Sequence, residues 1–166
     1  MKYSVTVEYA LHSLVHLISL PDQKTIGIKE LAEFQGLSET YLSKVFSKLA
    51  KAGIVLSIPG VNGGYRLAKE ASDITFWHVI RAIEGPKPMF QCKNLVAGTM
   101  IKDENTACSG CESNSFCLIN QTMLEAEKQM KQFLNGKTLQ WMHEELENIL
   151  PEEQRQATRA YFLKES

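Results

Sequence analysis

The stretch IKELAEFQGLSETYLSKVFSKLAK, residues 28–51, decides the fold of this chain. Residues 28–34 place apolar side chains at helical spacing and predict a short helix. A turn containing glycine follows, and Ser38 is a suitable N-cap for a second helix over residues 39–51. Two helices joined by a short turn of this kind form a helix-turn-helix motif.

The second helix of such a motif is the one that enters the major groove of DNA. Its apolar face comprises Tyr41, Leu42, Val45, Phe46 and Leu49. The opposite side carries hydroxyl and ammonium groups, which suit base edges and phosphates. We therefore predict DNA contacts from Ser38, Thr40, Tyr41, Ser43, Lys44, Ser47 and Lys48. Tyr41 is equally suited to a place in the core.

A β-hairpin is predicted directly after the second helix. Residues 54–58 are rich in β-branched side chains, residues 59–64 have turn composition, and residues 65–67 return as a second strand. A hairpin in this position is a wing, and glycines at its tip let the backbone approach DNA closely. The predicted DNA-binding residues of the wing are Asn62, Gly63, Gly64 and Arg66.

Helices are also predicted on both sides of this unit. Residues 3–19 form an amphipathic pattern, with Glu8 and His12 one turn apart at the edge of its buried face. Residues 74–84 predict a helix after the wing, with Ser72 and Asp73 as its cap. These elements give a mainly α fold, a winged helix-turn-helix with a two-stranded wing.

The C-terminal third of the chain predicts three more helices. Residues 118–134 carry an apolar stripe of Ile119, Met123, Ala126, Met130 and Phe133. Thr138 begins the next helix, which stops before Pro151, and the tail from residue 152 predicts a short helix. We divide the chain into four parts: the winged helix-turn-helix at residues 1–85, a cysteine-rich loop at 86–120, the long helix with the helix after it at 118–150, and the tail at 151–166.

Composition and charge limit the functional classes. The chain has 166 residues, of which 44% are apolar and 22% charged, as in a globular protein. Its N-terminus has no signal-peptide pattern and no apolar run could span a bilayer, so we expect a cytoplasmic protein without membrane contact. Residues 1–91 carry 10 Lys and Arg against 8 Asp and Glu, which suits DNA contact by that end. The sequence contains no nucleophile–base motif and no phosphate-binding loop, so we do not expect an enzyme.

All four cysteines lie within residues 90–120, at Cys92, Cys108, Cys111 and Cys117. Cysteine thiolates are ligands for iron–sulfur clusters and for zinc, and Cys108 and Cys111 have the spacing of a C-x2-C pair. In a reducing compartment, clustered cysteines favour a metal centre or a redox switch over structural disulfides. The residues leave three readings open: a metal cluster, a cluster-free thiol switch, and a structural zinc site.

The order of these elements resembles the Rrf2 family of bacterial transcription regulators from residue 1 to about residue 145. The most specific pieces are SETYLSKVFSKL at 38–49, GGYRLA at 63–68, ITFWHVIRAIEG at 74–85 and the C-x5-C pair Cys111 and Cys117. The resemblance implies a homodimer, in which the helix from about residue 118 is a long dimerisation helix that crosses its partner. It also implies a regulator, which we expect to be a repressor, that binds a pseudo-palindromic operator in double-stranded DNA.

The resemblance further implies an iron–sulfur cluster held by Cys92, Cys111 and Cys117, with Cys108 an additional cysteine. The family's histidine after the last cysteine is Asn120 here, so a further ligand must come from elsewhere. The redox-sensing member uses a glutamate and a histidine of its first helix across the subunit boundary, which makes Glu8 and His12 candidate ligands. A 2Fe–2S cluster is favoured if both ligate, and three cysteines with one oxygen ligand would suit 4Fe–4S. The cluster would sense redox state, nitric oxide or iron–sulfur status.

Two positions depart from the family pattern in the DNA-binding unit. The wing has Pro59 where the family often has an arginine, and the second helix has Ser43 where a glutamate is common. We expect these changes to alter which operator sequence is bound.

Overall fold

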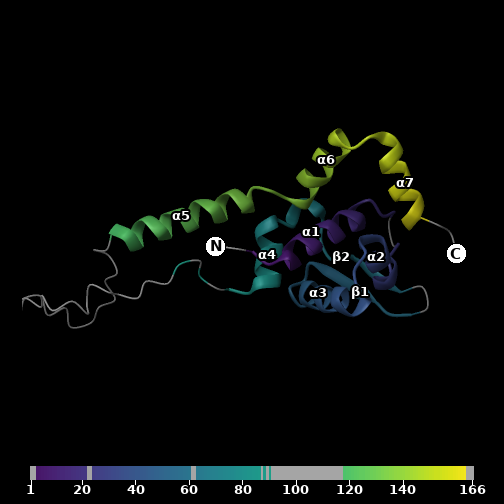
Figure 1. The fold of residues 1–166 in the computed structure, drawn as a ribbon, viewed down its shortest axis with the longest axis horizontal. Helices are drawn as coiled ribbons and strands as arrows, with labels where there is room; N and C mark the ends of the chain where they lie inside the picture. The colour runs from purple at the N-terminus through teal and green to yellow at the C-terminus, as the bar shows by residue number, and fades with distance from the viewer. Residues whose placement is uncertain are drawn as a thin grey trace, which may run out of the picture. The chain divides into compact units, whose positions relative to one another are not determined.

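The computed structural model describes residues 3–21, 24–60, 63–86, 88, 90 and 118–163. The chain forms two compact units, one of Lys2–Pro86 with Leu134–Ser166 and another made chiefly of Lys87–Phe133. Within the described residues, seven α-helices and one two-stranded antiparallel sheet are present (Figure 1). The mainly α winged helix-turn-helix predicted from the sequence is confirmed.

The helix-turn-helix consists of α2 (Ile28–Gln35) and α3 (Glu39–Lys51). Gly36 ends α2 with φ 65°, a left-handed conformation that glycine adopts without strain. The hydroxyl of Ser38 accepts a hydrogen bond from the backbone N–H of Tyr41 at 3.2 Å, so the predicted N-cap is confirmed. Both ends of the turn are therefore fixed by the residue types that the sequence places there.

The wing consists of β1 (Val55–Ile58) and β2 (Gly64–Leu67), which pair antiparallel with Val55 opposite Leu67. It is attached to the chain before α2 through Ile26, whose N–H donates to the carbonyl of Tyr65 at 3.1 Å and whose carbonyl accepts from the Tyr65 N–H at 2.9 Å. The base of the wing is thus hydrogen-bonded on one side to the residues that lead into the helix-turn-helix.

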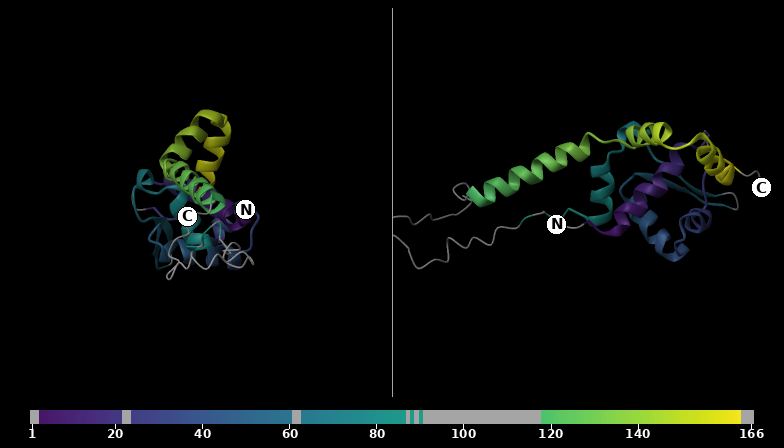
Figure 2. Two further views of the ribbon diagram at one scale, coloured as in Figure 1. Left: turned by 90° about the vertical axis from the view of Figure 1, so that its left-hand side faces the viewer. Right: turned by 45° about the horizontal axis from the view of Figure 1, so that its top comes forward.

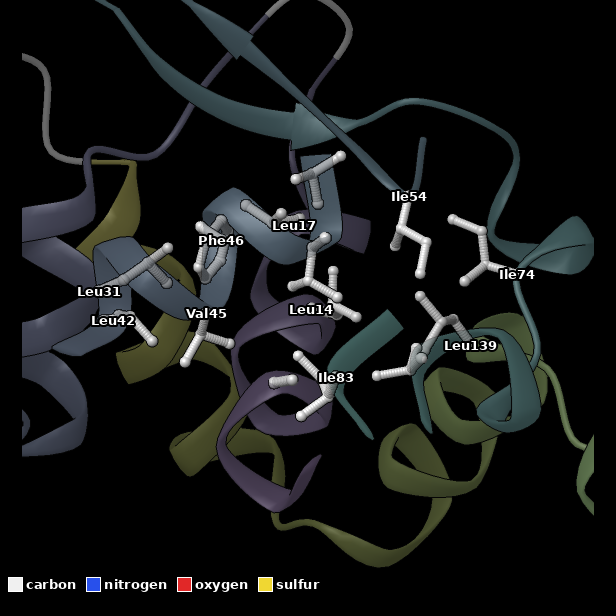
Figure 3. Packing of buried hydrophobic residues seen from close by; sticks show 14 of the residues in the cluster. Leu14, Leu17, Leu31, Leu42, Val45, Phe46, Ile54, Ile74, Ile83 and Leu139 are labelled. Carbon is white, nitrogen blue, oxygen red and sulfur yellow. The ribbon is translucent and has the colours of Figure 1, made fainter. Parts of the chain in front are cut away.

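The core of this unit forms around α1 (Val5–Ile18), whose Ala10 and Leu14 have no exposed surface. Figure 3 shows Leu14 among side chains from α3, from the segment after it and from α4 (Phe76–Glu84), including Val45, Ile54 and Ile83. Because α1 supplies the centre of this cluster, its orientation and that of α3 depend on each other.

One predicted helix start differs from the structure. The cap of α4 is Thr75, whereas Ser72 and Asp73 lie in a short 3-10 helix, η1 (Ala71–Asp73). Thr75 accepts a hydrogen bond from the His78 N–H, and Nδ1 of His78 accepts one from the Thr75 N–H, each at 3.2 Å. This reciprocal capping box, with histidine in the usual place of glutamate, prevails over the sequence signal two residues earlier.

Two C-terminal helices return to α1. The helix α6 (Leu139–Ile149) is joined to the start of α4 by backbone hydrogen bonds from Leu139 to Ile74 and from Phe76 to Lys137, each at 2.8 Å. The helix α7 (Glu152–Phe162) follows after Pro151. In Figures 1 and 2, α1 lies between the helix-turn-helix on one side and α6 and α7 on the other.

The other compact unit contains most of α5 (Leu118–Asn135), the long helix predicted from residue 118. Several large apolar side chains on α5 are exposed, among them Ile119 at 71% and Phe133 at 66%. Among the described residues, none of the helices combines the length and the apolar character that crossing a bilayer requires.

Candidate DNA interface and sensor helix

The outer face of α3 is built by the helix periodicity. Leu42, Val45, Phe46 and Leu49 are buried, and their mean direction fixes which residues point away from the core. At 100° per residue, the side chains within ~50° of the opposite direction are Thr40, Lys44, Ser47 and Lys51. All four are exposed. Ser43 lies further round and is half-buried, and Ser38 is occupied as the N-cap.

Lys51 was not among the residues predicted to bind DNA, although the sequence contained the signal. It lies eleven positions after Thr40, which is three helical turns plus ~20°, so it projects from the same face. With Lys44 it supplies two exposed ammonium groups on one side of the recognition helix, as phosphate contacts require.

Lys48, which is also predicted to bind DNA, makes a contact within the protein. It lies ~80° round from Thr40, at the edge of the outer face. Its Nζ donates a hydrogen bond to the backbone carbonyl of Ile83, in the last turn of α4, at 2.9 Å. In this structure the ammonium group therefore binds the protein, while Lys48 as a residue is exposed.

Tyr41 also turns toward the protein. Its hydroxyl shares a hydrogen bond with the hydroxyl of Thr6 at 2.7 Å, and its ring packs edge-on against Tyr9 at 6.0 Å between centroids. A second polar link joins α1 to the end of α2, because Gln35 donates from Nε2 to the buried hydroxyl of Ser13 at 3.0 Å. Both helices of the helix-turn-helix are therefore hydrogen-bonded to α1.

The wing contributes Gly63, Gly64 and Arg66 to the predicted interface, whereas Asn62 lies outside the described residues. A side chain on Gly64 would meet the carbonyl oxygen of Ile26 at 2.5 Å, so this glycine is required by close backbone packing. Nε of Arg66 is buried without a hydrogen-bond partner among the described residues.

The predicted sensor ligands fall into two groups. The four cysteines, Cys92, Cys108, Cys111 and Cys117, lie outside the described residues. Glu8 and His12 lie on α1 as predicted, one turn apart and exposed. The described residues contain no group of three or more metal-ligating side chains, so Glu8 and His12 could complete a centre only with ligands from elsewhere.

Glu8 and His12 line an open cavity of about 980 Å³ between α1, α6 and α7. Its walls are mostly apolar, with Leu11 of α1, Met142 of α6 and Phe162 of α7 among them. A glutamate and a histidine that face such a cavity are accessible to an incoming ligand-bearing segment. The donor set, one oxygen and one nitrogen, suits the open positions of an iron–sulfur centre held mainly by thiolates.

Ion pairs join α6 and α7 at the far side of this cavity. Glu147 of α6 forms ion pairs with Arg155 and Arg159 of α7. The hydrogen bond from Arg155 lowers the pKa of Glu147. Burial opposes this in part, and the charges of Arg155, Arg159 and His143 lower the pKa further. These groups tie α7 to α6.

His16 also lines the cavity. Its ring packs against Phe34 of α2 at 4.8 Å and against Phe162 of α7 at 4.9 Å between centroids. Burial lowers the pKa of His16 to about 4, with a further contribution from His12. His16 is therefore neutral at ordinary pH and serves as an aromatic contact between α1, α2 and α7.

Known proteins of similar sequence and structure identify the family of this chain. The Rrf2 family, described as an iron-dependent transcriptional regulator, matches residues 3–145. The chain is 30% identical over 139 residues to the HTH-type transcriptional regulator IscR of Vibrio atlanticus (strain LGP32), covering 84% of this chain and 73% of that protein. It is also 30% identical over 140 residues to YwgB of Bacillus subtilis (strain 168), a putative HTH-type transcriptional regulator, covering 84% and 83% respectively.

Solved structures agree with this assignment. IscR of T. potens superposes with a TM-score of 0.65 at 27% identity and covers 92% of this chain and 93% of that chain. CymR, the global cysteine regulator of B. subtilis, superposes with a TM-score of 0.64 at 25% identity and covers 87% and 97%. These relatives are regulators and not enzymes. The chain belongs to the Rrf2 family and is a DNA-binding transcriptional regulator of the winged helix-turn-helix type.

Proposed function

We propose that the protein is a homodimeric repressor whose affinity for a pseudo-palindromic operator is set by an iron–sulfur cluster. The cluster would be held by Cys92, Cys111 and Cys117 of one chain with Glu8 and His12 of its partner as candidate ligands. The observation that carries the proposal is the position of Glu8 and His12, which are exposed, one turn apart, and face an open cavity on α1.

The DNA-binding half of the proposal rests on α3 and the wing. Thr40, Lys44, Ser47 and Lys51 form one exposed polar face, from which hydroxyl groups would contact base edges and ammonium groups would contact phosphates. Gly63 and Gly64 would bring the wing backbone close to the duplex, with Arg66 near it.

Dimerisation is supported by the surface of α5. Ile119, Met123 and Phe133 fall on one stripe of this helix and are exposed by 71%, 41% and 66%. Exposed apolar stripes of this kind are typical of protein interfaces. We expect sedimentation analysis to give twice the 18.7 kDa mass of the chain, and Ile119→Asp to shift the protein toward monomer.

A bound iron–sulfur cluster would supply one-electron redox chemistry and reactivity toward oxidants and nitric oxide. The protein would make its affinity for DNA depend on the redox state and integrity of the cluster. While Glu8 and His12 are ligands, α1 is held to the partner chain, and Thr6 and Tyr41 carry its position to α3. When Glu8 and His12 are released from the cluster, α1 can shift. The spacing between the two recognition helices of the dimer then changes, and this spacing must match the DNA helical repeat of ~34 Å for the operator to be bound.

Metal content tests the cofactor directly. Anaerobically purified protein should be coloured and should contain iron and acid-labile sulfide, and Cys111→Ala should bleach it. Glu8→Gln and His12→Gln should shift the absorption spectrum while leaving cysteine ligation in place. Glu33→Gln, on the exposed surface of α2, is the matched control and should leave the spectrum unchanged. Colourless protein without iron would refute the cluster and leave the cluster-free thiol switch, whereas zinc in place of iron would indicate a structural site.

A further inference from the structure

The last turn of α4 is bonded to two other helices through consecutive residues. The carbonyl of Ile83 accepts a hydrogen bond from Nζ of Lys48 on α3 at 2.9 Å. Oε1 of Glu84 accepts hydrogen bonds from the backbone N–H and the hydroxyl of Ser4, at the start of α1, at 2.9 and 2.6 Å. Residues 83 and 84, which we call the α4 junction, therefore join the recognition helix to the helix that carries Glu8 and His12.

The bond from Lys48 follows from the chemistry of a helix end. The last carbonyl groups of a helix have no partners within it, and the negative end of the helix dipole attracts a cation. Gly85 donates to the carbonyl of Arg81 at 3.0 Å, which leaves the carbonyl of Ile83 for the ammonium group. Ile83 is only 5% exposed, so its carbonyl belongs to a part of α4 that is packed in the core.

We propose that Lys48 is a positioning residue and not a phosphate contact. It fixes the C-terminal half of α3 to the α4 junction from the edge of the outer face, whereas Lys44 and Lys51 lie nearer the centre of that face; all three residues are exposed. The junction also binds Ser4 at the start of α1, the helix that carries Glu8 and His12. The second part of the proposal, which rests on the proposed function, is that Lys48 transmits the position of α1 to the recognition helix.

Salt dependence separates the two roles. Each phosphate contact adds about one unit to the slope of log affinity against log salt, whereas a positioning residue adds none. Lys48→Met keeps the aliphatic stem and removes the ammonium group, Lys48→Arg keeps a cationic donor, and Lys44→Met is the matched control on the same helix. All are measured on the full chain with an operator fragment selected from random DNA.

We expect Lys48→Met to weaken operator binding about fivefold with an unchanged salt slope, as the loss of one hydrogen bond predicts. Lys48→Arg should restore most of the affinity, and Lys44→Met should reduce the slope by about one. A slope reduced equally by Lys48→Met would show that Lys48 contacts phosphate, and an unchanged affinity would show that the bond has no positioning role. Either result overturns the inference.

The second part has its own readout, the ratio of operator affinities before and after oxidation of the anaerobic protein. In Lys48→Met this ratio should move toward one, while in Lys44→Met it should equal that of the wild type. A wild-type ratio in Lys48→Met would refute transmission through Lys48. If this ratio is one in the wild-type protein, both the sensing function and the transmission through Lys48 are refuted. The salt slope still decides whether Lys48 is a positioning residue.

Discussion

The hydroxyl oxygens of Thr6 and Tyr41 lie 2.7 Å apart and share a hydrogen bond between α1 and the first turn of α3. Tyr41 was predicted either to contact DNA or to lie in the core, and the structure places its ring against Tyr9 and its hydroxyl on α1. The helix that carries Glu8 and His12 is therefore in direct polar contact with the DNA-reading helix.

Tyr41→Phe should weaken operator binding about three- to tenfold, because it removes one hydrogen bond that orients α3 and leaves the ring packing intact. Thr6→Val should have a similar effect from the other side of the bond. The double variant should then lose no more than either single variant, as measured by fluorescence anisotropy with an operator fragment. Losses that add fully in the double variant would mean that the two hydroxyl groups act independently.

Lys51→Ala should reduce the slope of log affinity against log salt by about one and should weaken specific and non-specific binding alike. The physical reason is that an exposed ammonium group on the outer face of α3 displaces a counterion from the DNA when it binds a phosphate. Lys128→Ala, on α5, is the control and should leave the slope unchanged. An unchanged slope for Lys51→Ala would remove this residue from the interface.

Gly64→Ala should lower the free energy of unfolding by roughly 1–3 kcal/mol, because the new methyl group would overlap the backbone of Ile26 and push the wing away. Gly27→Ala is the matched control, since a side chain there would meet nothing within 4 Å, and it should cost less than ~1 kcal/mol. Denaturant unfolding measures both. Equal stability of the two variants would contradict the role assigned to the contact between Gly64 and Ile26.

The sequence was sufficient for most of the fold because its signals are local. The cap at Ser38, the turn at Gly36 and the spacing of Val45, Phe46 and Leu49 depend on neighbours within one or two turns, and the structure agrees with each. The start of α4 was placed wrongly because Ser72-Asp73 and Thr75 are both good caps. Only the reciprocal bond with His78 separates them.

The partners of the predicted site residues were beyond local reasoning. Nothing in the sequence near Lys48 indicates a carbonyl 35 residues away, and the same separation divides Thr6 from Tyr41. The helix periodicity did place Glu8 and His12 correctly at the surface edge of α1. Their role as ligands, like those of the four cysteines, stays a prediction.

Acid should destabilise the metal-free protein through His16. Its pKa is lowered to about 4 in the folded state from 6.5, so protonation favours the unfolded chain. The contribution of His16 is fully present above pH 6.5 and is lost as the pH falls toward 4, with a slope of up to ~1.4 kcal/mol per pH unit. His16→Phe keeps the aromatic packing and should flatten this part of the profile of unfolding free energy against pH. Identical profiles for the wild type and His16→Phe would show that the pKa of His16 does not differ between the folded and unfolded states.

Cluster-dependent regulation is decided by operator affinity measured on one anaerobic sample before and after controlled oxidation, with iron and sulfide assayed in parallel. The operator affinity should change at least fivefold as the absorption of the cluster is lost, and Cys117→Ala, without the cluster, should show no such change. An affinity that is the same in both states while the cluster is present and then lost would contradict cluster-dependent regulation.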